Sequence, residues 1–211
     1  GTSKKVTKVY DGTTSTSSAT FGNATVTSAN GLSSNLSVTL SDQTYIYSSK
    51  EAGDNKLVTA DSAYSISSAS HSRHGDVYGL EASSTVKQIN NAQVTAKPVS
   101  LSGTRQYDGT TSVDSSDLTV SNFVGSETVT LSGSGSLSSA DVQSSSSLSS
   151  TSGLSLEDGS GGGLASNYTL TGGSQSVSVT KRPVVMSGSR EYDGTNTISA
   201  SDVSFVGTVG S

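Results

Sequence analysis

Three aspartates are the residues of this sequence whose type and spacing could do chemistry, because each stands in the same setting, Tyr-Asp-Gly-Thr. A carboxylate repeated in a fixed turn is a candidate calcium ligand. Calcium takes six to eight oxygens, usually from several carboxylates. One aspartate per copy falls short unless Asp114, Asp117, Glu127 or carbonyl oxygens from a loop join it. We therefore favour a structural turn over a calcium site. The copies are Tyr10, Asp11, Gly12, Thr13; Tyr107, Asp108, Gly109, Thr110; and Tyr192, Asp193, Gly194, Thr195.

The two histidines are a second candidate for metal chemistry. His71 and His74 have the i, i+3 spacing that can ligate zinc from a helix, but no third ligand is evident and residues 67–76 are expected to form a loop. Solvated histidines are the preferred interpretation. We predict no metal site and no cofactor.

The first third of the chain contains a group of aromatic and polar residues with no counterpart later in the sequence. Gathered on one loop face, they would suit recognition of a glycan or a protein. The alternative is that the tyrosines fill a variant core. The residues are Tyr45, Tyr47, Tyr64, His71, Arg73 and His74.

No pattern in the sequence indicates catalysis. The glycine-rich segment 159–163 lacks the following Lys-Ser/Thr of a phosphate-binding loop. No Gly-x-Ser-x-Gly elbow marks a nucleophilic serine, and the adjacent Glu157 and Asp158 would point to opposite faces of a strand. We therefore predict that the protein is not an enzyme.

Composition indicates folded β structure with a hydroxyl-rich surface. The 211 residues are 30% hydrophobic and 14% charged, with 50 Ser, 26 Thr, two Pro, no Cys and a net charge of −5. Disordered chains usually carry more charge or more proline. The absence of cysteine excludes disulfides. The absence of a basic cluster argues against nucleic acid as a partner, and the absence of a long apolar run argues against membrane insertion.

Apolar residues alternate with Ser and Thr over several short stretches, the period typical of half-buried strands. Leu36–Leu40, Val129–Leu131 and Leu154–Leu156 are the clearest examples. Residues 144–152 are expected to form a loop or a weak edge strand. Tyr168 and Val177 are assigned to the two strands of one hairpin. No stretch has a helical period, so the sequence predicts small, antiparallel, all-β domains.

The chain is a tandem array, because the Tyr-Asp-Gly-Thr motif recurs, with its tyrosines 97 and then 85 residues apart. We divide it into a divergent unit at 1–97, a second unit at 98–182 and an incomplete third at 183–211. Residues 202–207 are aligned with 117–125 by deleting three residues. The third segment is either a remnant of an artificial cut or a donor of strands to another unit, which would build a head-to-tail chain.

Further motifs accompany the repeated turn and extend the similarity over nearly the whole chain. They are Lys97-Pro98, Leu101-Ser102-Gly103, Val129-Thr130-Leu131-Ser132-Gly133, Asn167-Tyr168-Thr169-Leu170 and Val179-Thr180-Lys181-Arg182-Pro183. In this order the motifs resemble the YDG-type repeats of large bacterial surface proteins, such as filamentous-haemagglutinin-like adhesins secreted by the two-partner route, and the related MBG-type repeats. The resemblance implies extracellular stalk or adhesive modules. It does not identify a ligand or a catalytic residue. An immunoglobulin-like sandwich is the first choice of fold, and a β-grasp-like unit is the second.

The sequence therefore predicts elongated structural or adhesive modules of a secreted bacterial adhesin, which act as a stalk or spacer. The expected partners are neighbouring repeats, with homotypic contacts or contacts to a host-surface glycan or protein. One alternative is ligand binding through the divergent first unit. The other is a fibre subunit that assembles through residues 183–211.

Overall fold

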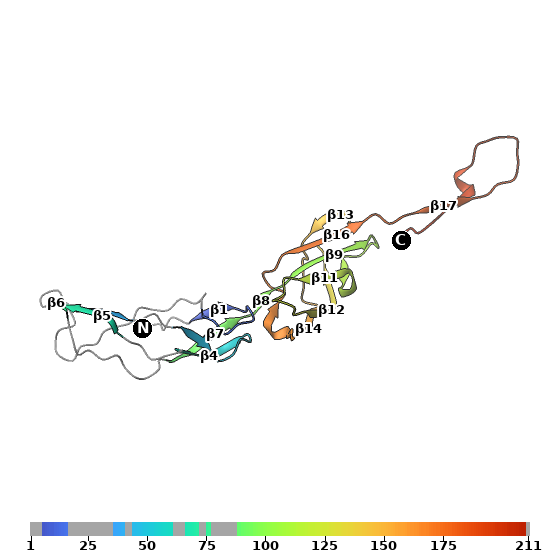
Figure 1. The fold of residues 1–211 in the computed structure, drawn as a ribbon. Helices are drawn as coiled ribbons and strands as arrows, with labels where there is room; N and C mark the ends of the chain where they lie inside the picture. The colour runs from blue at the N-terminus through green and yellow to red at the C-terminus, as the bar shows by residue number, and fades with distance from the viewer. Residues whose placement is uncertain are drawn as a thin grey trace. The chain divides into compact units, whose positions relative to one another are not determined.

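The computed structural model describes residues 6–16, 36–40, 44–60, 66–71, 75–76 and 88–209. The chain forms two compact units (Figure 1). Unit 1 comprises Gly1–Lys97 together with Ser166–Tyr168, and unit 2 comprises Pro98–Ala165 and Thr169–Ser211. A three-residue stretch of the second sequence repeat is thus part of unit 1.

Unit 1 contains a four-stranded sheet and a three-stranded sheet. The first has the order β1-β7-β4-β3, and the second has the order β2-β5-β6. The strands are β1 (Thr7–Val9), β2 (Leu36–Leu40), β3 (Tyr45–Tyr47), β4 (Gly53–Ala60), β5 (Ile66–His71), β6 (Gly75–Asp76) and β7 (Gln88–Thr95). The prediction of β2 from its alternation is confirmed. The prediction of a loop over 67–76 is wrong, because β5 pairs antiparallel with β2 along Leu36–Leu40.

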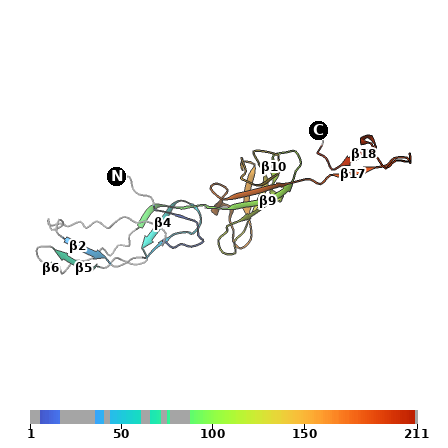
Figure 2. The same cartoon turned by 90° about the horizontal axis from the view of Figure 1, so that it is seen from above.

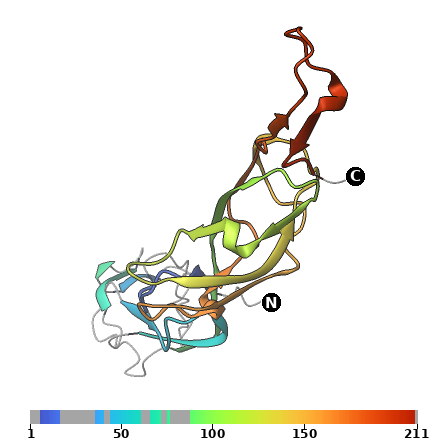
Figure 3. The same cartoon turned by 90° about the vertical axis from the view of Figure 1, so that its right-hand side faces the viewer.

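Unit 2 is built from a four-stranded sheet of order β11-β9-β16-β13 and a three-stranded sheet of order β10-β12-β14. A second view of these sheets, in green to orange, is given in Figure 3. The strands are β9 (Ser100–Gln106), β10 (Ser112–Asp114), β11 (Leu118–Ser121), β12 (Val129–Ser136), β13 (Gln143–Ser146), β14 (Leu154–Asp158) and β16 (Gln175–Thr180). Two-residue strands β8 (Lys97–Pro98) and β15 (Tyr168–Thr169) pair with each other.

The core of unit 2 confirms the alternating pattern of the sequence. Val177 and Val179 of β16 are almost completely buried. Ser176, which precedes them, and Ser178, which stands between them, are not buried. The same holds for Leu101 of β9, which is buried between serines. Strands β9 and β16 therefore each contribute one apolar face to a thin core. Its buried members are Leu101, Val113, Leu118, Leu137, Leu148, Leu154, Val177 and Val179.

Most strand pairs are antiparallel, but β9 and β16 of unit 2, and β1 and β7 of unit 1, run parallel. In unit 2, β9 and β16 pair from Gln175↔Leu101 to Thr180↔Gln106, in the middle of the sheet. In unit 1, β1 and β7 pair from Thr7↔Gln93 to Val9↔Thr95. We call each of these a terminal strand pair.

Two local predictions for unit 2 are settled by these pairings. The first residues of the serine-rich segment 144–152 belong to β13, which lies at the edge of its sheet, and the rest lie outside any named strand; this agrees with the predicted loop or weak edge strand. The predicted hairpin between Tyr168 and Val177 is wrong, because β15 pairs with β8 whereas β16 lies between β9 and β13. Alternation shows which face of a strand is buried but not which strand lies beside it.

The start of the third repeat forms an antiparallel hairpin of β17 (Val185–Gly188) and β18 (Val203–Val206) (Figure 2). Its register, Gly188↔Val203, reproduces Gly103↔Leu118 of β9 and β11, so the three-residue deletion assumed from the sequence is wrong. Met186 is 66% exposed and Phe205 is 60% exposed. Donation of this segment to another unit stays a prediction.

The fold is all-β, as predicted. Within the described ranges, the only helical elements are three-residue 3₁₀ turns, η2 (Ser115–Asp117), η3 (Ala165–Asn167) and η4 (Ala200–Asp202). None of the described residues forms a helix long and apolar enough to cross a membrane.

Candidate functional site

Each Tyr-Asp-Gly-Thr box is a turn closed by its own aspartate. Asp108 Oδ1 accepts hydrogen bonds from the Thr110 backbone N–H at 2.8 Å and from the Thr110 hydroxyl at 2.9 Å. Gly109 between them has φ +80°, a conformation that glycine adopts without steric cost. The first and third boxes repeat these two hydrogen bonds at 2.8–2.9 Å. The predicted structural turn therefore forms three times.

A basic side chain three residues before each aspartate completes the turn. Arg105 Nη1 lies 2.5 Å from Asp108 Oδ1, and Arg105 Nη2 donates to the Thr110 carbonyl. Lys8 takes the same role in the first box, with Nζ 2.7 Å from Asp11 Oδ1. Sequence reasoning missed this residue. The signal was present, because Lys8, Arg105 and Arg190 occupy the same place before the tyrosine in all three copies.

The basic side chains of the first two boxes are buried, and each therefore needs its ion pair with the aspartate. The side chain of Lys8 is 0% exposed and that of Arg105 is 5% exposed, whereas the Asp108 side chain is 46% exposed. A buried charge is costly unless it is paired and hydrogen-bonded. Lys8 Nζ also lies 5.5 Å from the centre of the Tyr47 ring, at a distance where cation–π attraction operates. The aspartate therefore neutralises an interior cation from the surface side.

The box also fastens the terminal strand pair. The Tyr107 backbone N–H donates to the Thr180 carbonyl at 2.9 Å, and the Thr180 hydroxyl donates to the Arg105 carbonyl at 3.2 Å. In unit 1, Tyr10 N–H donates to the Thr95 carbonyl at 2.8 Å, and the Thr95 hydroxyl donates to the Lys8 carbonyl at 3.2 Å. The turn thus begins beside the C-terminal end of the second strand of its terminal strand pair.

The three motif tyrosines have different surroundings. Tyr10 is 1% exposed, and its ring meets the ring of Tyr168 edge-on at a centroid distance of 5.7 Å within unit 1. Tyr107 is half-buried against the core of unit 2. Tyr192 is 94% exposed. Tyr10 and Tyr107 thus pack against the cores of their units, whereas Tyr192 does not.

Asn167, the neighbour of Tyr168, is completely buried in unit 1. Its Oδ1 accepts a hydrogen bond from the Ala52 N–H at 2.7 Å, and its Nδ2 donates to Glu51 Oε2. A buried amide needs such partners to offset its desolvation. The pair Asn167-Tyr168 is therefore an integral, buried part of unit 1, although in the sequence it belongs to the second repeat.

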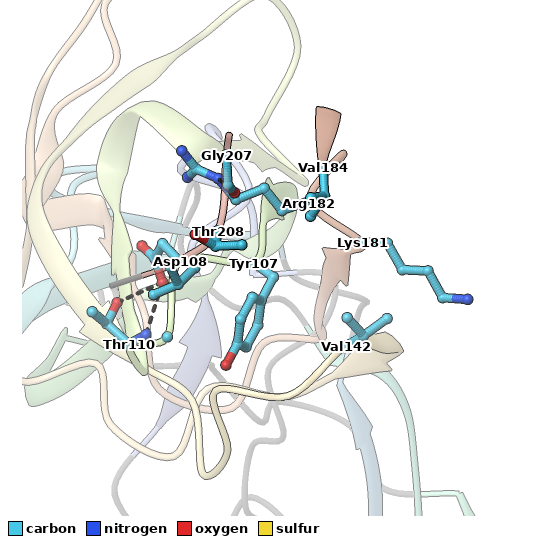
Figure 4. A pocket seen from close by; sticks show the side chains of 11 residues that line it. Tyr107, Asp108, Thr110, Val142, Lys181, Arg182, Val184, Gly207 and Thr208 are labelled. Atoms are coloured by element: carbon cyan, nitrogen blue, oxygen red, sulfur yellow. Dashed lines mark hydrogen bonds between the residues drawn. The ribbon is translucent and has the colours of Figure 1, made fainter. Parts of the chain in front are cut away.

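A depression of about 810 Å³ lies beside the second box, within unit 2. Tyr107 and Val142 stand on one side of it, and Arg182, Val184 and Gly207 stand on the other (Figure 4). Figure 4 also shows the hydrogen bonds from Thr110 to Asp108. The depression places a half-buried aromatic ring next to exposed backbone and aliphatic surface.

We expect the carboxyl group of Asp108 to titrate at a pH well below the range of an ordinary aspartate. The Thr110 backbone N–H, followed by the Arg105 guanidinium, lowers its pKa from 3.8 to about 2. A lowered pKa in the folded state contributes stability that is complete above pH 3.8 and lost as the pH falls through about 2. Carboxyl NMR titration should find this pKa, and Arg105→Ala should raise it. A wild-type value near 3.8 would contradict the geometry.

The arrangement is poorly suited to bind calcium. The Oδ1 atom of Asp108 already accepts hydrogen bonds from Thr110 and faces a guanidinium, which would repel a second cation. No group of three or more metal-ligating side chains occurs among the residues that the structure describes. The aspartate of the box instead forms hydrogen bonds and an ion pair within its own repeat.

The candidate ligand face of unit 1 is described only in part. Tyr47 is 2% exposed and lies beside Lys8, which favours the core alternative for this residue and corrects its assignment to a surface. Tyr45 is half-buried. His71 ends β5, and its side chain lies outside the description. Tyr64, Arg73 and His74 lie outside the described residues.

Fold and site together define a class of protein, namely tandem all-β repeats whose terminal strand pair is fastened by a self-contained turn. Comparison with known families agrees, since the YDG domain model matches residues 1–73 and 90–177. The chain belongs to the YDG domain family. No curated protein and no solved structure matches it.

Proposed function

We propose that this chain is a load-bearing spacer, a run of structural repeats in a secreted bacterial surface adhesin. Membership of the YDG family and the tandem arrangement support the proposal. So does a surface on which Ser and Thr replace most charges, because a neutral hydrated face allows close packing of parallel stalks. In this role the protein needs no catalytic group, and its partners are neighbouring repeats.

The terminal strand pair is the observation that carries the proposal. A pull along the chain draws β9 toward its N-terminal end and β16 toward its C-terminal end. Because the two strands are parallel neighbours, this pull slides them against each other along the whole register from Gln175↔Leu101 to Thr180↔Gln106. The hydrogen bonds of the ladder are then loaded together. An unzipping pull would instead break them one after another.

The box adds resistance at the far end of the same pair. The hydrogen bonds between Tyr107 and Thr180 and between Thr180 and Arg105 join the strands where β16 leaves the sheet. The Arg105–Asp108 ion pair then holds the turn that follows β9. Unit 1 repeats the arrangement with Thr95 and Lys8, so each unit opposes extension in the same way.

Single-molecule pulling of the chain by its two ends tests the spacer function. We expect separate unfolding events for the two units, each at a force set by the unfolding rate and not by equilibrium stability. Thr180→Val keeps the side-chain shape but removes the hydroxyl donor to Arg105, and it should lower the force for unit 2 alone. Smooth extension without unfolding peaks would overturn the proposal.

A further inference from the structure

Unit 1 shows how an Asn-Tyr pair is bound by a YDG repeat. Tyr168 rests edge-on against Tyr10. Asn167 is held by two groups of one short segment, the Glu51 carboxylate and the Ala52 N–H. That segment is shaped by the Ser49 hydroxyl, which accepts a hydrogen bond from the Glu51 N–H at 3.2 Å. An aromatic platform, a carboxylate and a backbone donor thus make up the acceptor.

Strand register identifies the corresponding positions in unit 2. Gly53 pairs with Val94 in unit 1, and Gln143 pairs with Val179 in unit 2. Val94 and Val179 stand immediately before the threonines that fasten the two terminal strand pairs. Gly53 and Gln143, the first residues of β4 and β13, are therefore equivalent.

A backbone hydrogen bond gives the same alignment independently. The Tyr47 N–H donates to the Thr14 carbonyl, and the Leu137 N–H donates to the Thr111 carbonyl, both at 2.8 Å. Thr14 and Thr111 each follow the last residue of their box directly. By both criteria, Asp141 corresponds to Glu51.

The same alignment makes Val142 the equivalent of Ala52, so every element of the acceptor recurs in unit 2. Tyr107 corresponds to Tyr10 and is half-buried. The Asp141 N–H donates to the Ser139 hydroxyl at 3.0 Å, which reproduces the local turn at Ser49. Val142 is 49% exposed and lines the depression together with Tyr107 (Figure 4).

We propose that Tyr107, Asp141 and Val142 form a second acceptor, which binds the Asn-Tyr pair of the YDG repeat that follows in a tandem array. The tyrosine of that pair lies against the Tyr107 ring. Its asparagine receives a hydrogen bond from the Val142 N–H and donates to the Asp141 carboxylate. The inference goes beyond the spacer function and needs only a tandem array, whatever the location of the protein.

The decisive experiment completes the third repeat. The last three residues, Val209-Gly210-Ser211, match Val124-Gly125-Ser126, so a second copy of residues 127–182 added after Ser211 continues the repeat in register. We expect amide exchange at Val142 to slow at least tenfold and oxidative labelling of Tyr107 to fall. Alanine at both positions of the added Asn-Tyr pair should reverse both effects. If the added segment is exchange-protected and Val142 and Tyr107 do not change, the proposal is wrong.

If the added segment does not fold, a second experiment tests the same acceptor with a peptide. The full chain is mixed with a peptide of residues 164–171 at millimolar concentration, and the amide spectrum is recorded. Shifts at Val142 that disappear with an Asn-to-Ala, Tyr-to-Ala peptide or in the Asp141→Ala protein support the acceptor. Their absence in the wild-type protein overturns it. If the unmodified chain alone shows Val142 protection that rises with its concentration, the pair comes from a second copy and the assignment to the following repeat is wrong.

Discussion

Replacing Tyr168 by alanine is expected to lower the free energy of unfolding of unit 1 by about 3 kcal/mol, the lower end of the range for removing a large buried aromatic ring. Tyr168 is 4% exposed, and its ring contacts the buried Tyr10. The substitution also disturbs the neighbouring Asn167, which is hydrogen-bonded to Glu51 and Ala52. The effect should appear in unit 1 although the altered residue belongs to the second sequence repeat.

Hydrogen exchange measured by mass spectrometry separates the two units. Peptides from β4 and β7 should exchange faster in Tyr168→Ala, and peptides from β9 and β16 should keep their wild-type rates. Tyr192→Ala is the matched control, because the same residue type is 94% exposed there and its removal should leave both units unchanged. Faster exchange confined to unit 2 would contradict the placement of the Asn-Tyr pair.

Asp108→Ala is expected to destabilise unit 2 by about 2 kcal/mol, within the range for losing hydrogen bonds to charged groups. The substitution removes the acceptor of the Thr110 N–H, the Thr110 hydroxyl and Arg105. Arg105, which is 6% exposed, then remains buried without its counter-ion. The estimate stays below that for a fully buried pair because the carboxylate is close to half exposed.

Urea denaturation, monitored by hydrogen exchange of the amides in β9 and β16, measures this loss of stability in unit 2. The double variant Arg105→Met, Asp108→Ala should recover part of the loss, since no charge is then left unpaired in the interior. Asp193→Ala, the same change in the third box, where the basic partner Arg190 is more exposed, should cost less. A change of under 0.5 kcal/mol for Asp108→Ala would place it with ordinary surface substitutions and would contradict a structural role.

The sequence was sufficient for the parts of the fold that depend on local pattern. Alternating apolar residues located β2, β12 and β14, Val177 was assigned correctly to a strand, and the Asp-Gly pair located the turns. The basic partner could have been found as well, since Lys8, Arg105 and Arg190 recur at one spacing. It was missed because a charged residue in a strand is ordinarily read as solvent-exposed, whereas Arg105 is buried.

Contacts between distant segments could not be predicted in this way. Periodicity reports the buried face of a strand and leaves its neighbours open, so the parallel pairing of β9 with β16 has no signature in either strand alone. The same limit explains the misassigned hairpin at Tyr168 and the position of Asn167 in unit 1. A short motif has the same appearance in the sequence whether it serves its own unit or another.

The central claim is that the terminal strand pair bears the load, and pulling unit 2 in two directions tests it most directly. The chain has no cysteine, so paired cysteine handles are unique. Handles at Ser102 and Lys181, both exposed, slide β9 along β16, whereas handles at Ser102 and Ser174 peel the same strands apart from one end. We predict a clearly higher unfolding force for the sliding pair. Equal forces in the two directions would contradict the account.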